Sequence, residues 1–228
     1  VPFHITGIRL VAQVHPADYT GSLHTPDLAI EKIWYTGAYG VRLNMLGRRF
    51  GSCLLARGDR YPFQGDGHVT MAAAIAAFSS PRIFELLHRE LNGTDSTNEC
   101  DLGCGEAYGA YPLHWVASVC EYFWASGDAV GFLAAAKSAE SILTEQTTAL
   151  LGASPPRIGF IGWDDRVGNG GDNLGIGDNA EGRFVWRALL LRSTAELSRA
   201  LTHAGEASRG QALSTRARWM RVKLRGEE

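Results

Sequence analysis

The strongest constraint on this sequence is the order of its helix-like segments, which are separated alternately by short turns and by long loops rich in Gly, Asp and aromatic residues. Long loops on a rigid scaffold often carry function, so this order predicts helical hairpins with a functional face built from the loops. Apolar residues at helical spacing predict seven helices, near residues 25–47, 67–78, 81–91, 111–125, 128–151, 179–202 and 206–224.

Residues 1–22 have a different pattern. The stretch HITGIRLVAQVHP alternates and is rich in β-branched residues, which predicts one or two strands near residues 3–15. We therefore expect two parts in the chain. Residues 1–22 would be a β-strand tail or a linker from a preceding β domain, and residues 23–228 would be the helical domain.

Composition argues against two classes of partner. The 228 residues are 45% hydrophobic, which is enough apolar material for one buried core. The 22 basic and 24 acidic side chains give a formal net charge of -2, which leaves no basic excess to hold a nucleic acid. No apolar run approaches the ~18–20 residues that a membrane helix needs, so no membrane span is expected.

The loop that enters the second helix has two carboxylates flanking aromatic side chains, Asp59 and Asp66. The helix dipole would stabilise Asp66 as an anion, whereas neighbouring rings would keep Asp59 protonated. One neutral and one charged acid is the arrangement that glycosidic bond cleavage needs. A simpler interpretation is that Asp66 caps the helix and Asp59 pairs with Arg57 or Arg60.

Two further segments could form a sugar-binding pocket. Trp163 stands beside Asp164 in a glycine-rich loop, so its indole could stack on a sugar ring while the acid accepts hydroxyl hydrogen bonds. Asp178 or Asn179 is expected to cap the following helix, with Glu181 in its first turn. The third segment has four polar residues just before or within a helix start: Glu106, Tyr108, Tyr111 and His114. Trp115, Val119, Tyr122 and Phe123 are expected to be core residues.

No metal ion or other cofactor is expected. His68, His88 and His114 lack metal-ligand spacing and read as ordinary polar or packing residues. The sequence has no nucleophile elbow, phosphate-binding loop, dinucleotide fingerprint or zinc-protease helix. Cys100 and Cys104 leave three interpretations open, namely free thiols, a small disulfide loop or part of a metal site.

Together these segments resemble the α-L-rhamnosidase-type glycoside hydrolases over roughly residues 5–202. The matching stretches are IEKIWYTGAYGVRLNM, RGDRYPFQGD, YPLHWVASVCEYFWASGD and FIGWDDRVG. The resemblance implies an (α/α)6 toroid of six helical hairpins, usually preceded by β-sandwich domains. It also implies a carbohydrate substrate and cleavage with inversion of configuration.

The most specific element of the resemblance is the stretch 57–66, which is similar to the family's acidic loop R-[DE]-R-x-x-W-x-G-D. The resemblance implies that Asp59 is the general acid with Arg60 beside it, that Phe63 contacts the sugar and that Asp66 binds substrate. Trp163 and Asp164 match a later pocket loop of the family. The family more often has Glu where Asp59 stands, and Leu54 replaces an acidic residue that the family has upstream.

The resemblance also bears on completeness. Seven helices with their connections take about 200 residues here. The twelve helices of a complete toroid would need about 340 residues at the same length per helix. We therefore expect a partial toroid, from a longer enzyme or a reduced relative, with self-association or a missing C-terminal half. The family's general base lies late in the toroid, and Glu106 and Glu181 are the residues of this chain considered for that role.

Two other functions remain open from the sequence. A non-catalytic carbohydrate-binding or interaction domain would keep the aromatic loops without the second acid. A polysaccharide lyase-like toroid enzyme would use a Tyr or His base near an Arg, for which Tyr108, Tyr111 and His114 are the nearest residues.

Overall fold

The computed structural model describes residues 4–9, 11, 14–46, 49–50, 63–93, 109–151, 158, 161 and 179–225. Its helices are α1 (Leu28–Leu43), α2 (Gln64–Phe78), α3 (Pro81–Gly93), α5 (Tyr111–Ser126), α6 (Ala129–Leu151), α7 (Ala180–His203) and α8 (Ala207–Arg225). Two short antiparallel strands, β1 (Met45–Leu46) and β2 (Arg49–Phe50), follow α1. The all-α class is therefore confirmed, and each of the seven expected helices is present.

Local side-chain chemistry explains several of the helix ends. The Asp27 carboxylate accepts a hydrogen bond from the Ala29 backbone N–H at 2.9 Å and caps α1, and Asn179 caps α7 in the same way through Gly182 N–H at 2.6 Å. Helix α5 ends at Gly127, whose φ of 70° lies in the left-handed region that glycine adopts without strain. These end signals can all be read from the sequence.

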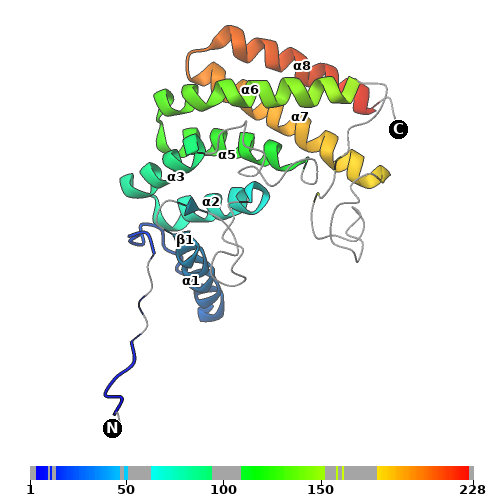
Figure 1. Cartoon of the computed structure of the whole chain (residues 1–228). Coiled ribbons are helices and arrows are strands. Elements are labelled where there is room, and N and C mark those ends of the chain that lie inside the picture. Colours follow the sequence, from blue (N-terminus) through cyan, green and yellow to red (C-terminus); the bar gives the residue numbers. More distant parts are fainter. Residues whose placement is uncertain are drawn as a thin grey trace.

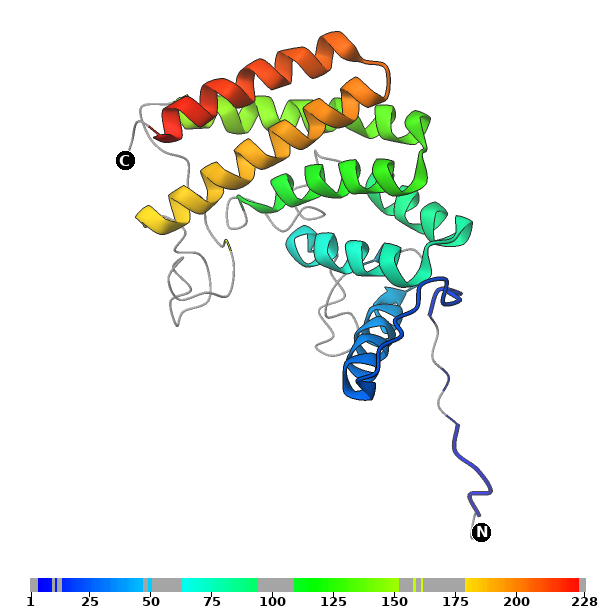
Figure 2. The same ribbon diagram turned by 180° about the vertical axis from the view of Figure 1, so that it is seen from behind.

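The helices form consecutive hairpins in two layers. Short turns connect α2 to α3, α5 to α6 and α7 to α8, and the partners of each hairpin lie against one another (Figure 1). Helix α5 packs between α2 and α7 in one layer, while α3 contacts α6 in the other. Helix α1 lies against α2 at one end of this array, and α8 lies at the other end (Figures 1 and 2).

The helices α2, α5 and α7 run in the same direction. All three begin on the right side of the array in Figure 1. After α2 and α5 a short turn and a returning helix bring the chain back to that side, where the next of these helices begins. The long connections of the sequence, at residues 51–62, 94–110 and 152–178, each lead into the N-terminal end of one of these three helices. The first described residues after each of these connections therefore lie at one end of the helical array.

The core runs between the two layers. Trp115, Val119, Tyr122 and Phe123 of α5 are all buried, as predicted from their helical spacing. The ring of Phe123 stacks on Phe132 of α6 with a centroid distance of 4.5 Å, which ties the α5–α6 hairpin together. None of the described helices combines the length and the apolar character needed to cross a membrane.

The strands expected near residues 3–15 are not confirmed. The described residues of that stretch, 4–9, 11 and 14–15, contain no strand, and Ile5, Ile8 and Val11 are exposed. A strand needs partners for its backbone groups and a surface for its apolar face. The His15 backbone N–H bonds to the Met45 carbonyl at 2.7 Å, but this bond lies at the end of the stretch and is not part of a described strand. Farther along, backbone hydrogen bonds from Thr20 and Gly21 to the Ala77 carbonyl hold this segment against α2.

The close approach of α7 and α8 gives a test of the packing. A Cβ on Gly210 would lie 2.8 Å from the Ser198 carbonyl oxygen and closer still to Thr202 Oγ1. We expect Gly210→Ala to lower the free energy of unfolding by about 1–3 kcal/mol, because the two backbones must separate. Gly37→Ala in α1, where a Cβ meets nothing within 4 Å, is the control and should raise it by up to about 1 kcal/mol. Urea denaturation measures both, and a Gly210→Ala variant as stable as wild type would contradict the packing.

Candidate functional site

The site lies where α2, α5 and α7 begin. Ile158, a described residue of the third long connection, accepts a hydrogen bond through its carbonyl from Gly109 N–H at 3.0 Å, just before α5. This bond places Ile158 beside the start of α5. The N-terminal ends of the three parallel helices are therefore the place at which segments distant in sequence meet.

A carboxylate and two aromatic rings form the first part of the site. The hydroxyl of Tyr111, the first residue of α5, donates a hydrogen bond to Asp66 Oδ2 of α2 at 3.3 Å. The ring of Phe63, at the N-cap of α2, packs edge-on against the Tyr111 ring with a centroid distance of 6.4 Å. The structure thus brings Phe63 and Asp66 together, and it adds Tyr111 from a second helix.

Asp66 does not cap helix α2. The helix begins one turn earlier than the sequence pattern indicates, and its N-cap residue is Phe63, without a side-chain cap bond. The interpretation of Asp66 as the cap is therefore wrong. Asp66 lies in the first turn of the helix, and it is only partly buried.

Glycine at position 65 allows the two helices to meet this closely. A Cβ there would lie 2.7 Å from Cζ of Tyr111, well inside van der Waals contact. The missing side chain lets the Tyr111 ring lie directly on the first turn of α2, which places its hydroxyl beside Asp66. Sequence analysis did not assign a role to this glycine.

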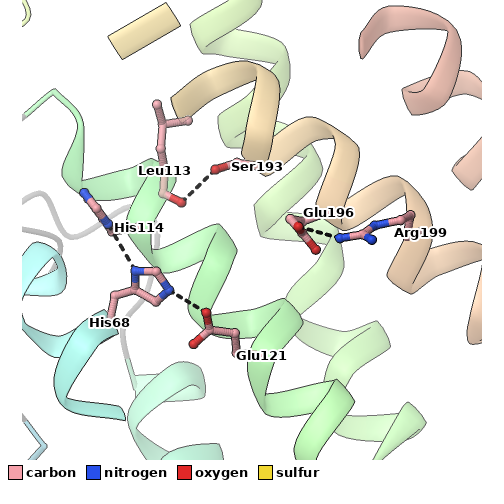
Figure 3. A network of polar contacts seen from close by, with 7 residues as sticks. All are labelled: His68, Leu113, His114, Glu121, Ser193, Glu196 and Arg199. Carbon is pink, nitrogen blue, oxygen red and sulfur yellow. Dashed lines mark hydrogen bonds and ion pairs between the residues drawn. The ribbon is translucent and has the colours of Figure 1, made fainter. Parts of the chain in front are cut away.

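A network of three polar side chains, His68, His114 and Glu121, forms the second part of the site (Figure 3). Glu121 Oε1 lies 2.9 Å from His68 Nε2, and His68 Nδ1 lies 3.2 Å from His114 Nδ1. His114 and Glu121 are seven residues apart on α5, so they lie on one face of that helix, and buried His68 reaches between them from α2. His114 is also the neighbour of Tyr111, with ring centroids 6.3 Å apart.

His114 is neutral at ordinary pH. Its burial, the neighbouring His68 and Arg192 of α7 together lower its pKa to about 4. Helix α7 is fixed beside it because the Ser193 hydroxyl donates to the Leu113 carbonyl at 3.1 Å (Figure 3). At the other end of this three-residue network, Glu121 Oε2 is buried and has no hydrogen-bond partner among the described residues.

These groups act through hydrogen bonds and ring contacts. Within the described part of the chain, no group of three or more His, Cys, Asp or Glu side chains could hold a metal ion. Cys120 is buried and free, and burial raises the pKa of its thiol, so it is an inert core residue. Cys53, Cys100 and Cys104 lie outside the described residues.

The other sequence-predicted residues divide into two sets. Glu181 lies exposed in the first turn of α7, at the same end of the array as Asp66. The remaining ones lie outside the described residues: Asp59, Arg60, Glu106, Tyr108, Trp163 and Asp164.

Sequence reasoning missed the partnership of His68, His114 and Glu121. The sequence did contain a signal for this partnership. One face of an otherwise apolar helix carries three polar residues, His114, Ser118 and Glu121. A polar stripe on a buried helix requires partners from a neighbouring element. No family model, curated protein or solved structure matches the chain.

The lowered pKa of His114 predicts a pH dependence of stability. The unfolded chain binds a proton on this residue below pH ~6.5, whereas the folded chain does so only near pH ~4. The contribution of neutral His114 to the free energy of unfolding is therefore complete above pH ~6.5. It is lost as the pH falls toward ~4, and the loss is on the order of 3 kcal/mol at most. His114→Gln should flatten this part of the profile of unfolding free energy in urea. His24→Gln changes an exposed imidazole and should keep the slope, and an unchanged slope in His114→Gln would contradict the assignment.

Proposed function

We propose that this chain is a glycoside hydrolase domain of the α-L-rhamnosidase type, which cleaves a terminal sugar with inversion of configuration. The observation that carries the proposal is the meeting of Phe63, Asp66 and Tyr111 at the common end of α2, α5 and α7. Aromatic rings beside an anionic carboxylate suit a sugar, whose apolar ring face stacks while its hydroxyls donate hydrogen bonds. Phe63 and Asp66 fall in the stretch 57–66, and Tyr111 is the first residue of the matching stretch YPLHWVASVCEYFWASGD.

The arrangement of the hairpins supports the proposed toroid. Successive hairpins place α2, α5 and α7 side by side, with α3 and α6 in contact behind them, as successive hairpins of an (α/α)6 toroid would. The edge formed by α1 exposes the apolar side chains of Leu28, Ile30 and Ile33. Such an edge fits an array in which a further hairpin or a second copy packs against α1.

In the proposed mechanism Asp59 protonates the leaving glycosidic oxygen, and a second carboxylate activates water on the opposite face of the sugar. The roles of Asp59, Arg60, Trp163 and Asp164 come from the resemblance alone, with Arg60 beside the acid and the last two lining the pocket. Glu181 stands at the same end as Asp66 and remains a candidate for the base.

The described residues supply the binding part of this mechanism. The carboxylate oxygens of Asp66, in the first turn of α2, would accept hydrogen bonds from sugar hydroxyls. Phe63 is partly exposed beside it and offers a ring to the sugar, whereas Tyr111 is buried. The hydrogen bond from Tyr111 fixes the carboxylate before the sugar arrives, which reduces the ordering cost of binding.

The general-acid role of Asp59 predicts a substrate-dependent loss of rate. Asp59→Asn should lower the turnover of an unactivated rhamnoside by about 10²–10⁴-fold, since the proton donor is removed. An aryl rhamnoside with a good leaving group needs less protonation and should lose less. Steady-state rates on both substrates test this. Near-wild-type turnover of the unactivated substrate by Asp59→Asn would exclude the assignment, as expected for an exposed Asp–Arg pair worth ~0–1 kcal/mol.

Asp66→Asn is the matched variant with a binding role. Its KM should rise, because an amide is a poorer acceptor for sugar hydroxyls, while the dependence on leaving group stays as in wild type. A protein that binds L-rhamnose without hydrolysing any rhamnoside would instead be a carbohydrate-binding domain. Release of an unsaturated sugar from a uronate polymer would identify a lyase.

A further inference from the structure

A cavity of about 610 Å³ lies between α5, α7 and α8, away from the candidate site. Its lining residues are Trp124, Ser198, Arg199, Thr202, His203, Gly210, Gln211 and Ser214. Trp124 belongs to the last turn of α5 and His203 to the last turn of α7, whereas Asp66 meets Tyr111 at the start of α5. The length of α5 between Tyr111 and Trp124 therefore separates the two places by about 20 Å.

An exposed aromatic ring forms one wall of this cavity. Trp124 is 45% exposed, and its ring centroid lies 5.1 Å from that of His203, with an angle of 56° between the ring planes. This contact supports the indole on one side and leaves much of its surface open to solvent. A large apolar ring exposed beside polar side chains suits stacking against the apolar face of a sugar ring.

Polar side chains of α7 and α8 line the same cavity. Gln211 and Ser214 each offer a donor and an acceptor, and neither side chain is hydrogen-bonded to another described residue. Arg199 pairs with Glu196 on its own helix through Nη2 (Figure 3), and its guanidinium has further N–H groups. These donors match the planar geometry of a carboxylate. The cavity thus combines a stacking surface, groups that bind hydroxyls and a cation.

A row of arginines continues from the cavity along α8. Arg218, Arg221 and Arg225 lie on the same helix face as the two α8 side chains of the cavity, because their spacing follows the helical repeat. All three are exposed, and none has an ion pair or hydrogen bond to another described residue. The α8 ridge, as we name this face, consists of Gln211, Ser214, Arg218, Arg221 and Arg225.

The α8 ridge carries positive charge that the chain as a whole does not have. Helix α8 contains five arginines, one lysine and no acidic residue, whereas the net charge of the chain is -2. From Ser214 to Arg225 the ridge extends about 16 Å along the helix. It runs from the cavity back toward the end of the array at which α7 begins (Figure 1). A ligand that follows it must carry several negative charges in a row.

We propose that the cavity and the α8 ridge form a second binding surface, which holds an acidic polysaccharide built of uronate units. One uronate ring stacks on Trp124 with its carboxylate on Arg199, while Gln211 and Ser214 bind its hydroxyls. The carboxylates of the following units pair with the arginines of the ridge. This inference does not rest on the proposed function, because it concerns binding without cleavage at a place about 20 Å from Asp66.

The surface fits this ligand better than it fits other polyanions. A single-stranded nucleic acid stacks successive bases on aromatic rings, and the α8 ridge contains no aromatic residue. An anionic membrane would need a free apolar helix face, whereas the apolar residues Leu213, Ala217 and Met220 of α8 are buried. An acidic peptide would pair with the arginines but would leave the hydroxyl-binding groups of the cavity unused.

Titration calorimetry of the full chain with polygalacturonate, a polymer of uronate units, tests the choice of ligand. We expect polygalacturonate to bind, and to bind less tightly as added salt screens the arginines. Dextran, which has sugar rings without charge, should bind more weakly. Poly-L-glutamate and oligo-dT, which have charge without the uronate ring, should also bind more weakly. No binding of polygalacturonate, or equal or tighter binding of any of the other three polymers, would overturn the proposal.

Two aromatic substitutions test the cavity. Trp124→Ala should weaken polygalacturonate binding about tenfold by removing the stacking surface. Tyr39→Ala is the matched control, because Tyr39 is a 55% exposed ring on α1, and it should leave the dissociation constant unchanged. Unchanged binding in Trp124→Ala, or an equal loss in Tyr39→Ala, would overturn the proposal.

Two double variants test the ridge at constant net charge. Arg218→Gln with Arg221→Gln should weaken binding about tenfold and reduce its dependence on salt. Arg216→Gln with Lys223→Gln removes the same charge from another side of α8, where Arg216 hydrogen-bonds Thr144 of α6, and should have a much smaller effect. Equal losses in the two double variants would overturn the proposal.

Asp66→Asn separates this surface from the candidate site. It should bind polygalacturonate as tightly as wild type, and a loss of binding would place the polymer at the candidate site and overturn the proposal. Rhamnoside hydrolysis is assayed separately, so a chain that binds polygalacturonate as described but hydrolyses no rhamnoside contradicts only the proposed function.

Discussion

The burial of helix α5 is the constraint on which the rest of this structure depends. It is enclosed by α2, α3, α6 and α7, and its side chains Trp115, Val116 and Val119 are almost fully removed from water. A polar side chain on a helix enclosed in this way loses its hydration, and a partner on a neighbouring helix offsets part of that cost. Tyr111, His114 and Glu121 have such partners on α2, namely Asp66 and His68, so the candidate site follows from how the central helix is buried.

The common direction of α2, α5 and α7 adds a second physical effect. Each helix N-terminus carries about half a positive charge, and three of them face the same end of the molecule. This field favours an anion and disfavours a cation within the first turns. Asp66 lies within this field, in the first turn of α2. The lowered pKa of His114 has other causes, which are burial, His68 and Arg192.

The sequence predicts the elements better than it predicts the contacts between them. Helix existence depends on local periodicity and on end signals such as Asp27, Asn179 and Gly127, all of which are visible in the sequence. The strand prediction near residues 3–15 used the same local logic and is not confirmed, because a strand depends on a partner that periodicity does not show. Phe63 and Asp66 were identified from their loop, but their contact with Tyr111 joins positions 45 residues apart. His68 was dismissed because it lacks metal-ligand spacing, although its partners lie on another helix.

A gain in folding stability does not explain why His68, His114 and Glu121 are placed together between α2 and α5. Glu121 Oε2 has no hydrogen-bond partner within the described residues, and neither do Trp115 Nε1 and Ser118 Oγ on the same helix. Each unsatisfied buried group costs about 1–3 kcal/mol. Replacing a buried charged or polar pair by well-packed apolar side chains is often neutral or stabilising, so a core selected only for stability would not need the pair His68–Glu121. What an apolar replacement could not reproduce is the polar contact of His68 with His114, which lies near the start of α5 beside Tyr111.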